Sequence, residues 1–214
     1  MINTIIFDMD GVICDTQKIH SKLDSKILGE LGVKISPRKI TNIFAGVKPE
    51  VYYAYLLNNK ISKNELDKII KLRWSRINSI AKREAKLMPG IKKLLRDLKN
   101  AGFKTAIASS SIKDFVCIIL NKFDIKKYFN IVITGSEIKS SKPDPEIFIK
   151  AAKALKSRHS DCLVIEDGIN GMYGAKKAKM HCIGLSNLSK DKIPTNYRVR
   201  KISQITIRYI ESIK

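Results

Sequence analysis

Two aspartates near the start of the chain are separated by a single residue and follow a short apolar run. The run is Ile5–Phe7, the acids are Asp8 and Asp10, and Gly11 comes directly after them. Carboxylates at the end of a buried strand are costly to desolvate unless a cation or a reaction uses them. Gly11 allows a turn that would leave both carboxyl groups in the crevice beyond the strand, where α/β folds bind ligands. The alternative is a strand end whose acids simply face water.

Two later apolar runs also end in polar residues, and a loop lysine lies between them in the sequence. The runs are Thr105–Ala108 and Cys162–Ile165, and Lys142 precedes a proline-rich turn. The polar residues that follow the two runs are Ser109, Ser110, Ser111, Glu166 and Asp167. Each feature alone has an ordinary explanation, because serines cap helices, loop lysines are usually solvated and acids are common in turns. Their occurrence together, in this order, indicates one site formed by several strand ends.

The order and spacing of these features resemble those of the haloacid dehalogenase-like hydrolase superfamily. Within it, the chain is similar to the β-phosphoglucomutase-like phosphatase branch. The residues that match the pattern of this branch are Asp15-Thr16, His20, Gly46-Val47 and Ser141-Lys142-Pro143. The resemblance covers nearly the whole chain. It implies an α/β fold with a Rossmann-like three-layer core, a parallel sheet and a small all-helical cap inserted after the first acidic pair.

The activity that the resemblance implies is hydrolysis of a small phosphomonoester, such as a sugar phosphate or a similar metabolite, through an aspartyl-phosphate. Asp8 is the implied nucleophile, and Asp10 is the implied acid that protonates the leaving oxygen and then activates water. Ser109 would bind the phosphate through its hydroxyl and the adjacent backbone N–H groups. Lys142 would balance the charge on Asp8 and on the transferring group. These four residues form the implied catalytic set.

The resemblance also implies a Mg²⁺ cofactor. Its protein ligands would be Asp8, the backbone carbonyl of Asp10, and Asp167, with Glu166 as either a direct or an outer ligand. A cation is also expected on physical grounds, because several acids around one site repel one another without it. Mg²⁺ prefers oxygen ligands in octahedral coordination and commonly uses one or two carboxylates.

The candidate substrate-binding residues are Thr16, His20, Gly46 and Ser110. His20 could contact the leaving group or lie at the hinge of the cap, although a single histidine on a helix is more often structural. Arg73 and Arg76 lie on an expected cap helix and could contact a second phosphate. Helix arginines are, however, more often solvated.

The main alternative is a β-phosphoglucomutase-type isomerase that uses the same aspartyl-phosphate. A mutase must hold a sugar bisphosphate by its distal phosphate, and the resemblance would then require basic residues just before Gly46 and three residues after it. This chain has Ala45 and Pro49 at those positions, and Lys48 is the basic residue nearby. We therefore expect a phosphatase. A nucleic-acid-binding or regulatory protein on a hydrolase fold is the second alternative, which the intact acid pair disfavours.

Strands alternate with helices in the second half of the chain. The expected strands cover residues 104–108, 130–134, 162–166 and 181–185, and the expected helices cover 91–100, 112–121, 145–156 and 169–179. This alternation predicts a parallel sheet with right-handed crossovers, which the N-terminal strand joins. Residues 16–87 show amphipathic runs between breaks, with a capping box from Ser62 to Glu65, and favour about four helices. We predict a discontinuous core domain, 1–15 and 88–214, and a cap domain, 16–87.

The composition of the 214 residues excludes several classes of protein. No apolar run approaches the ~20 residues that span a bilayer, so we expect no membrane partner. The N-terminus does not read as a signal peptide, and the four cysteines are scattered, which favours a cytoplasmic protein with reduced thiols in its core. The net charge is +21, but the lysines are spread almost evenly without interleaved aromatic residues. We therefore expect no nucleic-acid partner. The expected partner is a small phosphorylated metabolite, and the expected state is a monomer.

Overall fold

The computed structural model describes residues 1–188 and 192–213, and its centre is a parallel β-sheet. Among these residues the sheet has six strands in the order β3-β2-β1-β4-β5-β6. The strands are β1 Thr4–Phe7, β2 Lys104–Ala108, β3 Ile131–Ile133, β4 Cys162–Glu166, β5 His181–Leu185 and β6 Tyr197–Val199. Every neighbouring pair is parallel. The two strands that end in acids, β1 and β4, are therefore adjacent, as the sequence analysis requires.

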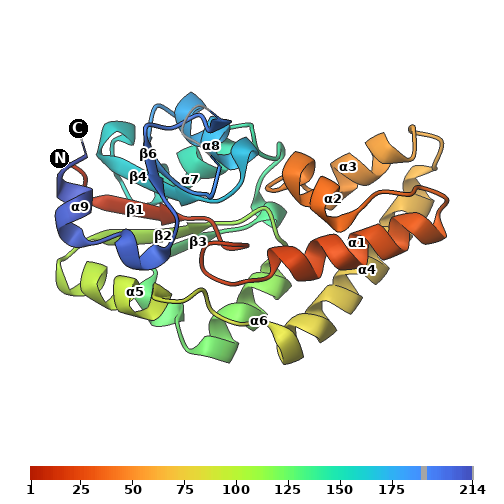
Figure 1. Cartoon of the computed structure of the whole chain (residues 1–214), viewed down its shortest axis with the longest axis horizontal. Coiled ribbons are helices and arrows are strands. Elements are labelled where there is room, and N and C mark those ends of the chain that lie inside the picture. Colours follow the sequence, from red (N-terminus) through yellow and green to blue (C-terminus); the bar gives the residue numbers. More distant parts are fainter. Residues whose placement is uncertain (189–191, 214) are drawn as a thin grey trace.

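Helices cover both faces of the sheet, which gives the three predicted layers (Figure 1). The core helices are α5 Ile91–Asn100, α6 Lys113–Phe123, α7 Glu146–Ala154, α8 Ile169–Lys177 and α9 Ile207–Glu211. Alternate side chains of β1 point to opposite faces of the sheet. Ile5 and Phe7 pack in the hydrophobic cluster that contains residues of α5 and α6, and Ile6 packs in the cluster that contains residues of α7 and α8. Burial on both faces explains why the strands read as continuous apolar runs.

The predicted helical insertion lies at one end of the sheet, on the right in Figure 1. Its residues form α1 Gln17–Glu30, α2 Pro37–Phe44, α3 Pro49–Leu56 and α4 Lys63–Glu84, which is the predicted number of helices for a segment described throughout. The capping box predicted at Ser62 and Glu65 begins α4. Helix α1 packs against α2 and α4, and α4 also packs against α6 of the core. The exact domain limits, 15/16 and 87/88, stay a prediction.

The two segments that connect the cap to the core lie side by side. The backbone N–H of Asp15 donates to the carbonyl oxygen of Lys86 at 2.9 Å, and that of Met88 donates to Ile13 at 2.9 Å. Between them, Cys14 and Leu87 form an isolated antiparallel bridge. The chain therefore enters and leaves the cap at one place.

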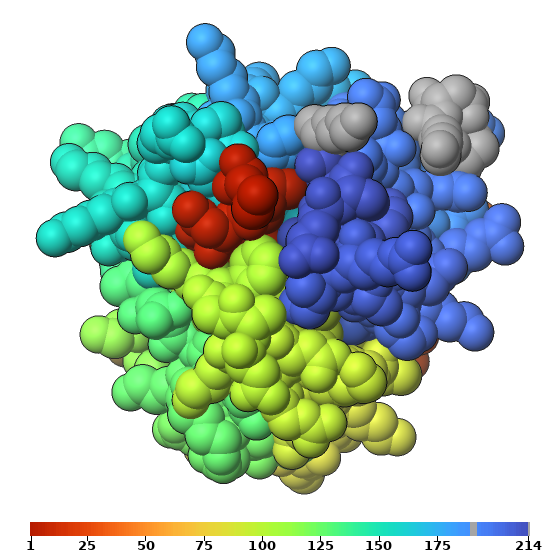
Figure 2. Space-filling model, turned by 90° about the vertical axis from the view of Figure 1, so that its left-hand side faces the viewer, coloured from red at the N-terminus to blue at the C-terminus, as the bar shows by residue number. Residues whose placement is uncertain are grey.

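The C-terminal segment was predicted to belong to the core domain but without any strand or helix, and the structure places β6 and α9 there. Figure 2 views the end of the molecule opposite the cap and shows the N-terminal residues next to this C-terminal segment. Buried side chains such as Ile202 and Ile210 join it to the main core. The prediction of core cysteines is confirmed for three of the four residues, while Cys117 on α6 is exposed.

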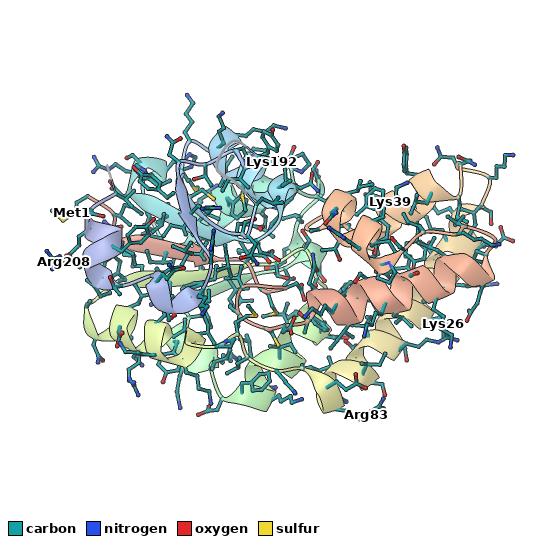
Figure 3. All side chains as sticks on the ribbon, viewed as in Figure 1. Met1, Lys26, Lys39, Arg83, Lys192 and Arg208 are labelled. Carbon is teal, nitrogen blue, oxygen red and sulfur yellow. The ribbon has the colours of Figure 1, made fainter. Side chains whose placement is uncertain are left out.

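Basic side chains are distributed over both parts of the molecule, as the even spacing of lysines predicts. In Figure 3, Lys26, Lys39 and Arg83 extend outward from the cap, and Lys192 and Arg208 extend outward from the core. None of the helices in the described ranges is long and apolar enough to cross a bilayer.

Candidate active site

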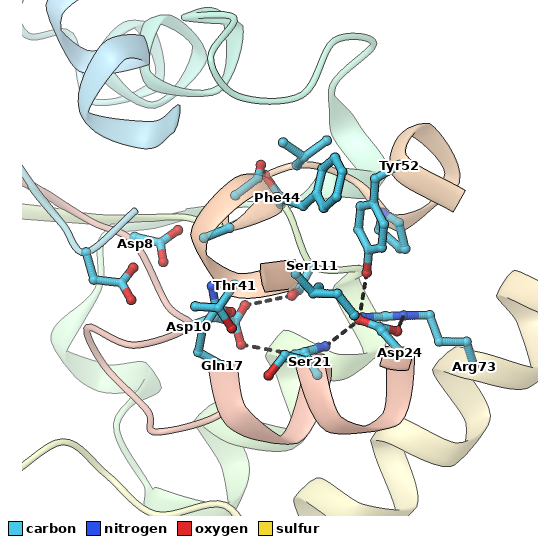
Figure 4. Close-up of a pocket in the computed structure, with 18 of the residues that line it drawn as sticks. Asp8, Asp10, Gln17, Ser21, Asp24, Thr41, Phe44, Tyr52, Arg73 and Ser111 are labelled. Atoms are coloured by element: carbon cyan, nitrogen blue, oxygen red, sulfur yellow. Dashed lines mark hydrogen bonds and ion pairs between the residues drawn. The ribbon is translucent and has the colours of Figure 1, made fainter. Parts of the chain in front are cut away.

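A cavity that is partly open to solvent lies where the carboxyl ends of the strands face the cap. Residues of both parts line it, and Figure 4 shows the acids of the core on one side and the side chains of the cap on the other. From the predicted site, the lining residues are Asp8, Asp10, His20, Gly46, Ser110, Glu166 and Asp167. The structure thus brings together residues that are up to 159 positions apart, from Asp8 to Asp167.

Lys142 joins the ends of β1 and β4 by pairing with two carboxylates. Its Nζ donates to Oδ1 of Asp8 at 2.5 Å and to Oε1 of Glu166 at 2.6 Å. The Lys142 side chain is buried, although loop lysines are usually solvated. Burial lowers the pKa of Lys142, but the two carboxylates outweigh this effect and raise it. Lys142 is therefore a buried cation fixed beside the carboxyl group of Asp8.

Three carboxyl groups lie close enough together to hold one cation. One oxygen from each of Asp8, Glu166 and Asp167 lies within 4.8 Å of the others. Burial, with the charges of Glu166 and Asp10, raises the pKa of Asp8 to about 8 despite Lys142. Burial and the same neighbouring acids also raise the pKa of Asp167 well above its usual value. The site therefore favours a proton or a metal ion among these groups.

Two glycines leave room for this acidic cluster. Gly11 has a φ of +93°, and a Cβ at this position would lie 2.0 Å from Oδ2 of Asp167. A Cβ at Gly171 would lie 1.7 Å from Oε1 of Glu166. Any larger residue at either position would displace a carboxylate, so both glycines are needed for the close approach of backbone and acid. Gly11 was noted in the sequence for its turn, but Gly171 was not connected with Glu166.

Asp10 lies in a different environment from Asp8. The hydroxyl of Thr16 donates to Oδ1, the hydroxyl of Ser111 donates to Oδ2 at 2.8 Å, and Nε2 of His20 lies 3.2 Å from Oδ1. Burial disfavours the ionised form, but His20 and the two hydroxyl groups outweigh it and lower the pKa of Asp10 to about 2. Environments that separate the pKa values of two nearby acids are typical of acid–base sites.

The three serines after β2 lie in different places. Ser109 is fully buried, and its Oγ accepts a hydrogen bond from the backbone N–H of Ser111 at 3.1 Å. Ser110 donates its hydroxyl to the carbonyl oxygen of Gly46 at 2.6 Å and so joins the core to the cap. Ser111 contacts Asp10, a contact that the sequence analysis did not single out. The phosphate-binding roles of Ser109 and Ser110 stay predictions.

His20 is held between the core and a buried ion pair of the cap. Its Nδ1 lies 2.9 Å from Nη2 of Arg73. Arginine can only donate, so Nδ1 accepts and the imidazole proton is on Nε2, which faces Asp10. The expectation of a solvated Arg73 is therefore wrong: the side chain is buried and lines the cavity. Arg76 is partly exposed and lies 3.9 Å from Glu30.

Asp24 is the counterion of Arg73, and the sequence analysis missed it. Its Oδ1 accepts from Nε of Arg73 at 2.6 Å and its Oδ2 accepts from Nη2 at 3.0 Å. The hydroxyls of Tyr52 and Tyr53 also donate to this carboxylate, at 2.6 and 2.9 Å. A signal was present, because His20 and Asp24 are four residues apart on α1 and so share one helix face.

The end of α2 and the loop between α2 and α3 are hydrogen-bonded to the core. Nδ2 of Asn170 donates to the carbonyl oxygens of Ile43 and Ala45 at 2.9 and 3.0 Å. Nζ of Lys48 donates to the carbonyl oxygen of Ile138 at 2.6 Å. Together with the bond from Ser110 to Gly46, these contacts hold the cap closed over the acids.

A family model described as haloacid dehalogenase-like hydrolase matches residues 5–185 of the sequence. The chain belongs to the haloacid dehalogenase-like hydrolases. This confirms the predicted family and, with the relatives below, the predicted class of enzyme, a phosphatase of this hydrolase family.

Relatives of this hydrolase include two phosphatases and one mutase. Hexitol phosphatase B of Escherichia coli (strain K12) is 27% identical over 182 residues, which are 83% of this chain and 81% of that protein. The phosphorylated carbohydrates phosphatase of Thermotoga maritima is 27% identical over 177 residues, 83% and 82% of the two chains. The crystal structure of β-phosphoglucomutase from Clostridium difficile superposes with a TM-score of 0.88 and 29% identity, covering 99% of this chain and 96% of that one.

Proposed function

We propose that this hydrolase is a Mg²⁺-dependent phosphatase that acts on the phosphomonoester of a sugar or a similar metabolite through an aspartyl-phosphate. One observation carries the proposal: the buried ammonium of Lys142 lies 2.5 Å from Oδ1 of Asp8. Asp10, two residues after Asp8, has a lowered pKa, whereas the pKa of Asp8 is raised. A nucleophile, a proton carrier and a fixed positive charge are the three groups that phosphoryl transfer needs. The substrates named for the two phosphatase relatives support a sugar-like substrate.

The residues of the acidic cluster fit Mg²⁺. Carboxylate oxygens are the ligands it prefers, and the raised pKa values of Asp8 and Asp167 indicate a charge that a cation would neutralise. Glu166 uses Oε1 for Lys142 and Oε2 for the backbone N–H of Gly168 at 2.8 Å. We therefore assign Asp8, Asp167 and the backbone carbonyl of Asp10 as ligands and Glu166 as an outer group. When bound, Mg²⁺ would add positive charge beside the phosphate oxygens.

The raised pKa of Asp8 keeps its carboxyl group protonated at neutral pH, and it would release this proton to solvent when a cation occupies the acidic cluster. In the first step, the resulting carboxylate attacks phosphorus while the bond to the leaving oxygen breaks. Lys142 holds the attacking carboxyl group and offsets its charge. Asp10, with its pKa of about 2, is ionised before the substrate arrives. The proton that it passes to the leaving oxygen therefore arrives with the substrate, because a phosphate monoester has its second pKa near ~6.

In the second step, Asp10 takes a proton from the water that hydrolyses the aspartyl-phosphate. The hydrogen bonds from Thr16 and Ser111 fix the orientation of its carboxylate. Ser109 accepts through its oxygen, which leaves its own proton to donate to a phosphate oxygen. Closure of the cap over these groups would exclude bulk water and other acceptors.

The test is phosphate release from a panel of sugar phosphates, nucleotides and phosphoglycolate with Mg²⁺, before and after Asp8→Asn. We expect the variant to lose turnover, because it removes the nucleophile and conserves volume. Rapid acid quench of the wild type, followed by mass spectrometry, should find a phosphoryl group on the peptide that contains Asp8. Asp15→Asn is the matched control, since Asp15 is an exposed acid. Wild-type turnover in Asp8→Asn would overturn the assignment.

The mutase is the second candidate, and the similarity to β-phosphoglucomutase from Clostridium difficile favours it. Supplying β-glucose 1-phosphate with a bisphosphate primer, and measuring glucose 6-phosphate separately from free phosphate, distinguishes the two activities. Isomerisation without phosphate release would assign the mutase. Lys48, the basic residue nearest to Gly46 in the sequence, donates to the backbone carbonyl of Ile138, and this contact supports the phosphatase.

A further inference from the structure

We propose that the Asp24–Arg73 ion pair sets the charge that the cavity accepts at the end of the substrate remote from the phosphate. It makes the enzyme selective for a monophosphate whose remote end is uncharged and hydroxylated, such as a sugar or alditol phosphate, over one that carries a second phosphate or a carboxylate. This inference rests on the proposed function and names the substrate class of that same site.

The pair lies on the cap side of the cavity, away from Asp8. Figure 4 shows Asp8 at one end, Asp10 between, and Asp24 with Arg73 at the other end. Asp24 and Arg73 both line the cavity and are almost completely buried. A substrate whose phosphate lies beside Asp8 would therefore extend its remote end toward this pair.

The remote end of the cavity lacks a free positive charge among the described lining residues. Arginine and lysine are represented there by Arg73 alone, and two oxygens of Asp24 cancel its charge at 2.6 and 3.0 Å. Nδ1 of His20 accepts from Nη2 of Arg73 and Nε2 of His20 lies 3.2 Å from Oδ1 of Asp10, so both imidazole nitrogens already have partners. Lys48 donates to the carbonyl of Ile138. A second anion would lose its water and face the carboxylate of Asp24 without a counterion.

Two residues that line the same part of the cavity, Arg73 and Trp74, carry unpaired hydrogen-bond donors. Nη1 of Arg73 and Nε1 of Trp74 are buried and have no hydrogen-bond partner within the described chain. Buried N–H groups normally have an acceptor, and the hydroxyl oxygens of a sugar or alditol would supply one. Arg73 then recognises the substrate as a hydrogen-bond donor whose charge is already compensated.

Aromatic rings complete this end of the cavity. Phe44 and Tyr52 are stacked with their ring centres 5.1 Å apart, and both line the cavity together with Trp74. Figure 4 shows the rings of Phe44 and Tyr52 on the same side of the cavity. Rings of this kind pack against the C–H groups of a carbohydrate without requiring charge.

The experiment compares two substrates that share the phosphate and differ at the remote end: glucitol 6-phosphate, which ends in a hydroxyl, and 6-phosphogluconate, which ends in a carboxylate. We expect the wild type to have the higher kcat/KM for glucitol 6-phosphate. Asp24→Asn keeps the shape of the side chain and exposes the charge of Arg73. We expect this variant to shift the ratio of the two kcat/KM values toward 6-phosphogluconate by about tenfold or more.

Two further variants separate charge from structure. The double variant Asp24→Asn with Arg73→Gln removes both charges and should return the ratio toward that of the wild type. Glu30→Gln removes the partner of Arg76 outside the cavity and should leave the ratio unchanged. A general loss of stability would lower both kcat/KM values and leave their ratio in place. A wild type that prefers 6-phosphogluconate, or an Asp24→Asn variant whose ratio does not move, overturns the inference.

Measuring the binding of the two ligands by calorimetry distinguishes failure of the ion-pair inference from failure of the proposed phosphatase activity. If the wild type releases phosphate from neither substrate, the proposed phosphatase fails on this pair, and the ratio of the two dissociation constants tests the ion pair on its own. If Asp24→Asn does not fold, the inference is tested by comparing the substrate ratio of the wild type with that of the double variant. Equal affinity of the wild type for both ligands, or no binding of either, overturns the inference.

Discussion

Asp8 and Asp10 are two residues apart, and their surroundings favour opposite protonation states. Asp8 is buried among other acids, which raises its pKa to about 8, whereas hydroxyl groups and His20 surround Asp10 and lower its pKa to about 2. The end of β1 at Phe7 makes this possible, because a strand that continued through both acids would place their carboxyl groups on one face. Division of labour between the acids therefore follows from local geometry.

The first residue-scale prediction concerns the proton carrier. Asp10→Asn keeps the size of the side chain but cannot gain or lose a proton at neutral pH. We expect single-turnover rates for both formation and breakdown of the aspartyl-phosphate to fall by about 10²–10⁴-fold. Quenched-flow measurement of the two phases checks this. If both phases kept their wild-type rates, Asp10 would not be the acid and base.

A second residue-scale prediction concerns acid unfolding. Burial opposes ionisation of Asp24, but Arg73 and Tyr52 outweigh it and hold its pKa below the usual value. The ionised carboxylate therefore contributes stability that is fully present above about pH 4 and is lost as the pH falls through the lowered pKa. We expect Asp24→Asn to start less stable and to lose less of its free energy of unfolding between about pH 4.5 and pH 2.5.

Urea unfolding across this pH range measures that difference. Asp15→Asn, at an exposed position, should decline in parallel with the wild type. Parallel decline of Asp24→Asn and the wild type would mean that Asp24 is not held ionised in the folded protein.

At the scale of elements, the loop between α2 and α3 is the contact that decides whether the cap is closed. Its backbone carbonyls accept hydrogen bonds from Asn170 and Ser110 of the core. The loop is also close to the site, because a Cβ at Gly46 would lie 3.1 Å from Cδ of Lys142. Closure of the cap is thus coupled through direct contact to the position of Lys142, the side chain to which we assign a catalytic role.

Removal of the Asn170 amide should weaken closure. Asn170→Ala loses two hydrogen bonds, a cost of about 1–3 kcal/mol in the closed form. We expect a rise in KM of about tenfold, with a smaller change in the rate of the chemical step, because Asn170 does not touch the acids. Steady-state kinetics and limited proteolysis of the cap connections check this, with Asn100→Ala on α5 as the exposed control. Unchanged KM and unchanged cleavage would contradict a closing role for this side chain.

At the scale of the whole molecule, the acidic cluster connects metal binding to stability. A carboxyl group whose folded pKa is raised binds more protons in the folded state than in the unfolded one. Without metal, the free energy of unfolding therefore falls as the pH rises from about 4 to about 8. A bound divalent cation replaces the proton and removes this loss.

We therefore expect Mg²⁺ to raise the melting temperature more at about pH 8.5 than at about pH 6. Differential scanning fluorimetry with and without Mg²⁺ measures the gain. Asp167→Asn should reduce it at the higher pH, because the variant lacks one of the assigned ligands. An equal gain at both pH values would show that protons and Mg²⁺ do not compete for these carboxyl groups.

The core and the acids of the site could be predicted from the sequence because their signals are local. Strands buried on both faces read as apolar runs, and Asp8, Glu166 and Asp167 directly follow such runs. The short strand β6 lies at the edge of the sheet and has three residues, too few to show a period. The C-terminal segment could therefore be assigned to the core domain from the sequence, but its strand and helix are recognised only in the folded molecule.

The remote end of the cavity could not be predicted, because its residues are distant in the sequence and come into contact only when the helices of the cap pack together. Arg73 on α4 has the sequence context of a solvated helix arginine, and Asp24 on α1 is 49 positions away. In the structure they share one face of the α1–α4 contact with Trp74 and Ile77, both buried. Arg73 does fall within the apolar spacing of Ile70, Trp74 and Ile77, the one local sign that it points inward.

The two paired connections of the cap have a consequence for chain entropy. Because the backbone groups of Asp15 and Lys86 are hydrogen-bonded at 2.9 Å, the cap is one long loop inserted in the core, with the two ends of the loop held together. The entropic cost of closing a loop grows only with the logarithm of its length, by about 0.6 kcal/mol for each doubling. Asp8, Lys142, Glu166 and Asp167 all lie outside this loop. The cap, to which we assign substrate selection, can therefore change in length and sequence while the core, to which we assign the reaction with phosphate, keeps its fold.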